Sequence, residues 1–139
     1  MRAVGIILAG GNSNKMRELT HKRAVAAMPI AGSYRAIDFA LSNMSNSHIQ
    51  KVAVLTQYNA RSLNEHLNSS KWWDFGRKQG GLYVFTPTIT ADNGYWYRGT
   101  ADAIYQNLEF LKRCHEPYVI ITSGDAVYKM DYNKVLEYH

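Results

Sequence analysis

Apolar residues along this chain gather in short runs that alternate with polar segments. Four of the runs are continuous and rich in β-branched residues, which is typical of strands buried on both faces of a parallel sheet. These predicted strands cover residues 3–9, 51–56, 82–87 and 118–122. Helical signals lie between them. Strands that alternate with helices predict an α/β fold, with three layers around a mostly parallel sheet.

Two helices are predicted in the first half of the chain. Ser33 lies where an N-cap would, and apolar residues at helical spacing follow it, so we expect a helix to about Asn46. Ser62 and Glu65 resemble a capping box over an apolar pair, which predicts a short second helix.

A third helix is predicted to begin at Thr100, which can act as its cap, and to run to about residue 113. Its apolar face would consist of Ala103, Ile104, Leu108 and Leu111. Another helix begins near Val135, and the chain stops at His139. A finished domain seldom ends so abruptly, so we expect a fragment of a longer protein.

Two long segments lack a clear period. Residues 10–32 are mostly polar, basic or glycine-containing, and so long a segment without structure usually serves function. We expect a loop there with at most a short helical turn. Residues 68–81 carry Trp72, Trp73 and Phe75. They are expected to form a loop or irregular helix that packs its aromatics at the edge of the domain.

Composition narrows the class of protein. With 139 residues, 46% of them hydrophobic and 19% charged, the chain has the size and apolar content of one globular domain. No apolar run approaches the roughly 20 residues of a membrane span, and no secretory signal is visible. We therefore expect a cytoplasmic protein without a membrane partner. Cys114 is the single cysteine, which excludes an intrachain disulfide.

The net charge of +5 is unevenly distributed. Five basic residues and one acidic residue lie between positions 15 and 35, namely Lys15, Arg17, Lys22, Arg23 and Arg35 against Glu18. Because this stretch follows a glycine pair, it favours a phosphate-bearing small molecule or an anionic effector over nucleic acid. A solvated basic surface is the alternative.

The loops that follow the strands of an open parallel sheet meet at one edge, where ligands bind. Gly10 and Gly11 follow the first strand, and glycines let backbone amides approach phosphate oxygens closely. The loop lacks the patterns of P-loop NTPases and of dinucleotide-dependent dehydrogenases. Asp125 follows the last strand, where it either holds Mg²⁺ or satisfies amides of a turn.

Several longer motifs together resemble one family. They are Leu-Ala-Gly-Gly at 8–11, Lys-Arg-Ala at 22–24, Ile-Asp-Phe-Ala-Leu-Ser-Asn at 37–43, Thr-Gln-Tyr at 56–58, Trp-Tyr-Arg-Gly-Thr-Ala-Asp-Ala at 96–103 and Tyr-Lys-Met-Asp-Tyr at 128–132. The chain is similar to glucose-1-phosphate adenylyltransferases, or ADP-glucose pyrophosphorylases, which make ADP-glucose from ATP and glucose 1-phosphate for glycogen or starch. The resemblance implies that residues 1–139 are the N-terminal part of a Rossmann-like nucleotidyltransferase domain. It also implies that full-length members continue into the rest of that domain and a left-handed β-helix.

The resemblance also implies site residues. Gly10 and Gly11 would line the triphosphate, Lys15 and Asp125 are the catalytic candidates, and Asp125 would also hold Mg²⁺. Lys22 and Arg23 correspond to a basic pair linked to effector response. The residues expected around the nucleoside are Gln57, Tyr97, Gly99 and Thr100.

The chain departs from the family pattern at charged positions. Catalytic members read Leu-Ala-Gly-Gly-x-Gly-Thr-Arg-Leu, whereas residues 12–16 here are Asn-Ser-Asn-Lys-Met. Lys15 thus replaces a phosphate-facing arginine with a point charge, Val25 replaces a lysine, and Ala126 replaces a histidine. The pattern is similar to a noncatalytic, regulatory glycogen-biosynthesis subunit that associates with a catalytic subunit in a hetero- or homo-oligomer. An active adenylyltransferase is the alternative.

Overall fold

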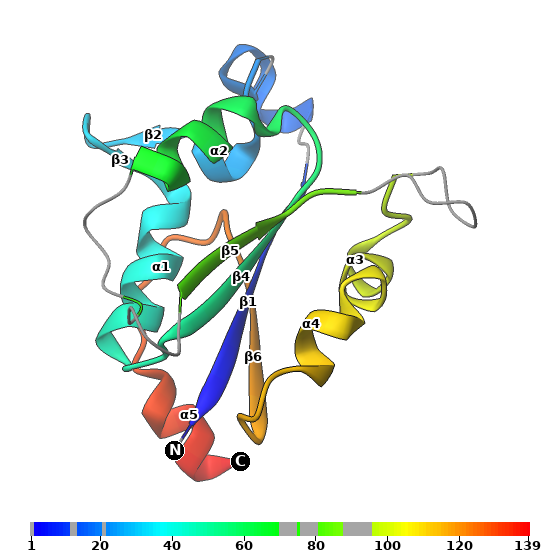
Figure 1. The fold of residues 1–139 in the computed structure, drawn as a ribbon. Helices are drawn as coiled ribbons and strands as arrows, with labels where there is room; N and C mark the ends of the chain where they lie inside the picture. Colours follow the sequence, from blue (N-terminus) through cyan, green and yellow to red (C-terminus); the bar gives the residue numbers. More distant parts are fainter. Residues whose placement is uncertain (1, 12–13, 21, 70–74, 76–80, 88–95) are drawn as a thin grey trace.

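The computed structural model describes residues 2–11, 14–20, 22–69, 75, 81–87 and 96–139. Its centre is a sheet of four parallel strands in the order β5-β4-β1-β6 (Figure 1). The strands are β1 (Ala3–Ala9), β4 (Lys51–Thr56), β5 (Gly81–Phe85) and β6 (Tyr118–Ser123). The predicted strands and the α/β class are confirmed, and only β5 and β6 differ in their bounds, by one or two residues.

The register of the strands brings their carboxyl ends to one edge of the sheet. Ala9 at the end of β1 pairs with Thr56 at the end of β4, and Leu8 pairs with Ser123 at the end of β6. The segments that follow β1, β4 and β6 therefore leave the sheet side by side.

One face of the sheet is covered by three helices, α1 (Ala36–Asn46), α2 (Ala60–Ser69) and α5 (Tyr132–Tyr138) (Figure 1). They bury the larger of two apolar clusters, as the spacing of their apolar residues predicts. Its largest fully buried side chains are Ile7, Ile37, Leu41, Met44, Val52, Val54 and Leu63. The sheet and these helices thus form two of the three predicted layers.

The opposite face carries α3 (Thr100–Gln106) and α4 (Leu108–Lys112), which pack on a smaller cluster around Ile6 and Leu55. We predicted one continuous helix here, and that prediction is wrong. The helix breaks at Asn107, whose side-chain amide donates to the carbonyl of Ala103 at 2.8 Å. Such a side-chain bond competes with the regular backbone ladder.

The start of α1 also differs from the prediction. Ser33 is not its N-cap, because the chain first forms a two-stranded antiparallel ribbon of β2 (Pro29–Ile30) and β3 (Tyr34–Arg35). The helix begins after Arg35, whose backbone N–H donates to the Asp38 carboxylate at 2.9 Å. An acidic side chain in the first turn thus satisfies an amide at the helix start.

The predicted capping box of α2 is wrong as well. The helix starts at Ala60, so Ser62 lies inside it, and the Ser62 hydroxyl accepts a hydrogen bond from Arg35 at 3.3 Å. Glu65 instead pairs with Arg61 one turn before it, at 3.2 Å.

The segment after β1 is more regular than predicted. It contains two short 3-10 helices, η1 (Asn14–Thr20) and η2 (Val25–Ala27), where we expected at most one helical turn. Trp72 and Trp73 lie outside the described residues, while Phe75 is buried in the larger cluster.

Two further expectations concern membrane-spanning helices and the single cysteine, Cys114. Within the described part of the chain, no helix is long and apolar enough to cross a bilayer. The Cys114 thiol donates to the carbonyl of Phe110 at 3.2 Å, and burial raises the pKa of this thiol. Cys114 therefore lies as a neutral side chain at the end of α4.

A buried amide ties α1 to the segment after β6. The Asn43 side chain, only 4% exposed, donates to the carbonyl of Tyr128 at 3.0 Å and accepts from the amide of Met130 at 3.1 Å. One turn later, the Ser47 hydroxyl accepts from the amide of Tyr132 at 2.9 Å. These bonds satisfy the backbone of a segment that has no regular structure of its own.

We expect Asn43→Ala to lower the free energy of unfolding by about 2–4 kcal/mol, because it leaves two backbone groups without partners. Urea unfolding measures this change. Asn46→Ala, at the exposed end of the same helix, is the matched control and should change stability by no more than about 0.5 kcal/mol. Equal stabilities of the two variants would contradict the role given to Asn43.

Candidate functional site

A pocket of about 460 Å³ opens at the carboxyl ends of β1, β4 and β6. Its walls come from the segments that follow these strands, from η2 and from the start of α3. The lining residues are Leu8, Ala9, Gly10, Gly11, Val25, Ala26, Leu55, Gln57, Tyr58, Tyr97, Arg98, Gly99, Thr100, Ala103, Ser123 and Asp125. Parallel sheets typically bind ligands at this edge.

One end of the pocket combines apolar and amide groups. Gln57 follows β4, and its side-chain oxygen accepts from the backbone N–H of Tyr97 at 2.7 Å. The Tyr97 ring is buried, and its hydroxyl accepts from Asn107 at 3.0 Å. Burial raises the pKa of Tyr97, so its hydroxyl stays neutral. At the rim, Tyr58 stacks on Trp96 with ring centres 5.6 Å apart.

Gly10 and Gly11 differ from each other in their surroundings. A side chain at Gly10 would approach the Cβ of Gln57 to 3.2 Å, whereas a side chain at Gly11 would meet nothing within 4 Å. Gly10 thus packs the end of β1 closely against the segment after β4. Gly11 leaves its backbone open toward the pocket.

The wall formed by η2 is apolar. Val25 and Ala26 both line the pocket, and Val25 is 9% exposed. The N–H of Ala24 donates to the carbonyl of Asn59 at 3.2 Å, which joins the start of η2 to the segment after β4. Within the described residues, Arg98 and Asp125 are the charged side chains of the lining.

Asp125 lies at the end of the pocket next to η2. The amide of the preceding Gly124 donates to the carbonyl of Leu8 at 2.9 Å, and the Ser123 hydroxyl donates to the Asp125 carboxylate. The described residues contain no group of three or more histidine, cysteine or acidic side chains arranged for a metal. From this part of the chain, Asp125 alone is placed to contribute a carboxylate to Mg²⁺.

The fold brings the six predicted nucleotide-binding residues into one pocket, since Gly10, Gly11, Gln57, Tyr97, Gly99 and Thr100 all line it. Their binding role stays a prediction.

The basic residues of the long segment are placed differently. Lys22 and Arg23, predicted to bind an effector, do not line the pocket; Lys22 is exposed and Arg23 half-buried. Lys15 belongs to η1, and its side chain lies outside the described residues, as do Asn12 and Ser13.

The segments after β4 and β6, predicted to lie at the ligand-binding edge, also bring Tyr58 and Ser123 to the lining, whereas sequence reasoning missed several other lining residues, among them Ala26 and Arg98. Each is adjacent in sequence to a residue that we had singled out, so neighbouring positions were the available signal. Ala26 could not have been predicted from its residue type, because a small apolar residue becomes a pocket wall only when η2 folds across the strand ends.

Residues 4–139 match the family model described as nucleotidyl transferase. The chain belongs to the nucleotidyl transferase family. This match includes every residue that lines the pocket. The predicted family membership is thereby confirmed.

Similar nucleotidyl transferases are named glucose-1-phosphate adenylyltransferase. The protein of Thermosipho africanus (strain TCF52B) is 49% identical over 136 residues, which are 98% of this chain and 33% of the relative. Those of Clostridium perfringens (strain SM101 / Type A) and Clostridium novyi (strain NT) are 51% and 47% identical, over 98% of this chain and 35% and 36% of the relatives. The chain spans about a third of the length of these relatives.

Gly124 permits the close packing of this nucleotidyl transferase pocket. A Cβ there would lie 3.2–3.3 Å from the side chains of Ile7, Ala9 and Ala26, all of them buried. We expect Gly124→Ala to cost about 1–3 kcal/mol of stability, because none of these side chains has room to move.

Thermal or urea unfolding tests this expectation. The matched control is Gly11→Ala, which places the same methyl group in open space and should change stability by about 0.5 kcal/mol at most. If Gly124→Ala were as stable as Gly11→Ala, the packing of η2 against β6 would be looser than described.

Proposed function

We propose that this chain is the nucleotide-binding part of a glycogen-synthesis protein of the glucose-1-phosphate adenylyltransferase type. In this proposal the pocket binds ATP, and the protein is a regulatory subunit with little catalysis of its own. The observation that carries the proposal is the apolar wall at Val25, in a pocket whose described lining has one cationic side chain.

The shape and chemistry of the pocket support a nucleoside at one end. Leu55, Tyr97 and Ala103 offer apolar surface to a base. The side-chain oxygen of Gln57 is already occupied by the amide of Tyr97, so the Gln57 NH₂ group is left as a donor to a ring nitrogen.

The other end suits phosphates through backbone rather than side-chain groups. Gly11 has open space in front of its backbone, and Gly10 lies beside it. Backbone amides of glycines approach phosphate oxygens without obstruction from a Cβ. Asp125 is the ligand that we propose for Mg²⁺, which would supply positive charge to the triphosphate when bound.

Transfer of a nucleotidyl group requires neutralisation of charge at the reacting phosphate. Val25 cannot contribute to this, and Arg98 is the one cation among the described lining residues. Removal of a single charged donor from a transition state typically costs about 10²–10³ in rate. The altered residues 12–16 add to this deficit. The pocket thus favours binding over turnover.

The other partners follow from this assignment. A catalytic subunit of ADP-glucose pyrophosphorylase is the proposed partner in an oligomer in the cytoplasm, where the protein responds to an anionic effector. Lys22 and Arg23 are suited to an effector because they lie outside the pocket and would not compete with ATP. The rest of the transferase domain and a β-helix domain are proposed for the longer protein.

An active glucose-1-phosphate adenylyltransferase is the second candidate. Two observations favour it: Asp125 and the glycine pair are retained in the pocket, and relatives of about half identity carry that name. In that case the protein would convert ATP and glucose 1-phosphate to ADP-glucose and pyrophosphate.

Synthesis of ADP-glucose by the full-length protein, alone and mixed with a catalytic subunit, separates the two candidates. We expect little product from the protein alone and a changed rate or effector response in the mixture. High activity of the protein by itself would overturn the regulatory assignment in favour of the second candidate.

Restoring the residues of the family pattern tests why the protein alone is proposed to have little catalytic activity. We expect the combined changes Ser13→Gly, Lys15→Arg and Val25→Lys to raise the rate of the protein alone by about 10²-fold, because they add one cationic donor at position 25 and replace a point charge at position 15 with a forked guanidinium. The matched control keeps the first two changes and has Val25→Ile, so that the wall stays apolar. The account of the deficit fails if the two variants are equally active.

A further inference from the structure

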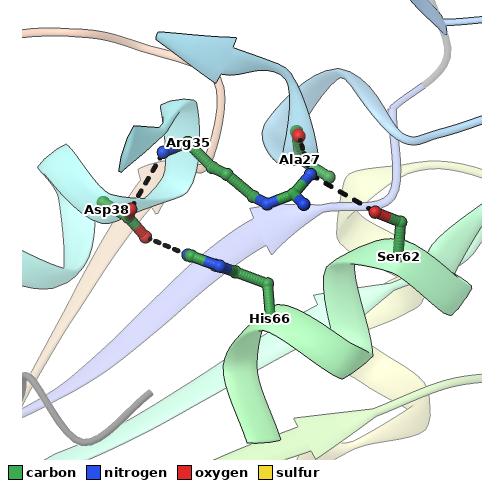
Figure 2. A network of polar contacts seen from close by, with 5 residues as sticks. All are labelled: Ala27, Arg35, Asp38, Ser62 and His66. Atoms are coloured by element: carbon green, nitrogen blue, oxygen red, sulfur yellow. Dashed lines mark hydrogen bonds and ion pairs between the residues drawn. The ribbon is translucent and has the colours of Figure 1, made fainter. Parts of the chain in front are cut away.

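A network of polar contacts surrounds Arg35 beside the pocket (Figure 2). The terminal nitrogen Nη1 of Arg35 donates to the carbonyl of Ala27 at 2.7 Å and to the hydroxyl of Ser62 at 3.3 Å. Its backbone N–H donates to one oxygen of Asp38, whose other oxygen lies 2.6 Å from Nε2 of His66.

The network joins four elements, of which β3 and α1 are consecutive in sequence. Arg35 ends β3, Asp38 lies in the first turn of α1, and Ala27 is the last residue of η2. Ser62 and His66 are one turn apart on α2 and so face the same direction. The side chain of Asp38 is 8% exposed and that of His66 is 15% exposed, so these groups meet away from bulk water.

The contact with Ala27 matters because η2 is a wall of the pocket. A single 3-10 turn is too short to hold its own position, so its anchors determine where it lies. Backbone bonds fix its two ends: the N–H of Ala24 donates to Asn59, and the carbonyl of Met28 accepts from Ala36 at 3.0 Å. Rotation of the turn about the line through these ends is opposed by the burial of Ala26 and Ala27 in the larger apolar cluster and by the bond from Arg35 to the Ala27 carbonyl.

The position of η2 affects one end of the pocket more than the other. Ala26 packs on Gly124, next to Asp125, where we place the phosphates. Gln57 and Tyr97 are joined to each other by their own hydrogen bond and do not belong to the network. A shift of η2 therefore disturbs the phosphate end and leaves the nucleoside end in place.

We propose that Arg35 is a positioning residue for the phosphate end of the nucleotide pocket, acting through the carbonyl of Ala27. This inference rests on the proposed binding of ATP. Because Asp38 bonds to the backbone of Arg35, replacing the Arg35 side chain leaves the start of α1 and the contact between Asp38 and His66 intact.

The test compares affinities for ATP with Mg²⁺ and for adenosine in the full-length protein by calorimetry. We expect Arg35→Ala to weaken ATP binding about 10-fold, the equivalent of one charged hydrogen bond, with adenosine binding changed by less than about twofold. Arg35→Lys keeps a donor and should recover part of the loss. Ser62→Ala removes only the weaker contact and should have a smaller effect.

Arg61→Ala is the matched control. Its side chain is 94% exposed and pairs with Glu65 on the outer surface of α2, so its loss should leave both affinities unchanged. If Arg35→Ala weakened ATP and adenosine equally, in step with a lower melting temperature, Arg35 would be a structural residue only. Unchanged ATP affinity in Arg35→Ala would also overturn the proposal.

A second measurement keeps the inference separate from the proposed function. Amide hydrogen exchange without nucleotide reports on η2 directly, through the N–H groups of Ala27 and Met28 that bond to Ala24 and Val25. We expect faster exchange of these amides in Arg35→Ala and not in Arg61→Ala. If the unaltered protein bound neither ligand, the proposed function would fail, and the exchange of η2 would still decide the role of Arg35.

Discussion

The parallel pairing of β1 with both β4 and β6 is the constraint on which the rest of the structure depends. Because Ala9 pairs with Thr56 and Leu8 with Ser123, the three strands end together. Residues far apart in sequence, such as Gly10, Gln57 and Asp125, then meet around one pocket. Backbone hydrogen bonds buried under two apolar layers hold this arrangement.

The pocket depends equally on what closes its side. η2 is a single turn of small buried residues, and it is held by the tight fit of Ala26 against Gly124 and by hydrogen bonds with Arg35 and Asn59. Close packing and hydrogen bonding thus both hold η2 in place. The sheet positions the floor of the pocket, while Arg35 at the end of β3 and the backbone carbonyl of Asn59, just before α2, help to position its wall.

The two candidate functions differ in charge rather than in fold. Both proposals assign phosphate binding to backbone groups at Gly10 and Gly11, whereas turnover needs cations near the reacting phosphorus. The apolar Val25 lines the pocket without the positive charge that the lysine of the family pattern would bring there. The fold of the nucleotidyl transferase family is therefore compatible with the proposed regulatory role. In the segment after β1, the side chains that pack and the side chains that would neutralise phosphate charge are different ones.

The sequence alone predicts the strands, the layers and about half of the described residues that line the pocket. Continuous apolar runs predict strands, although burial on both faces is wrong for the edge strand β6, where Val119 and Ile121 are exposed. Glycines mark close backbone approach at the strand ends. Tertiary structure alone decides where α1 begins and where η2 forms a wall of the pocket. These features depend on partners distant in the chain: Arg35 meets Ser62 27 residues later, and Asn43 meets Tyr128 85 residues later. The local sequence pattern does not reveal such hydrogen bonds, because they join residues that only the folded chain brings together.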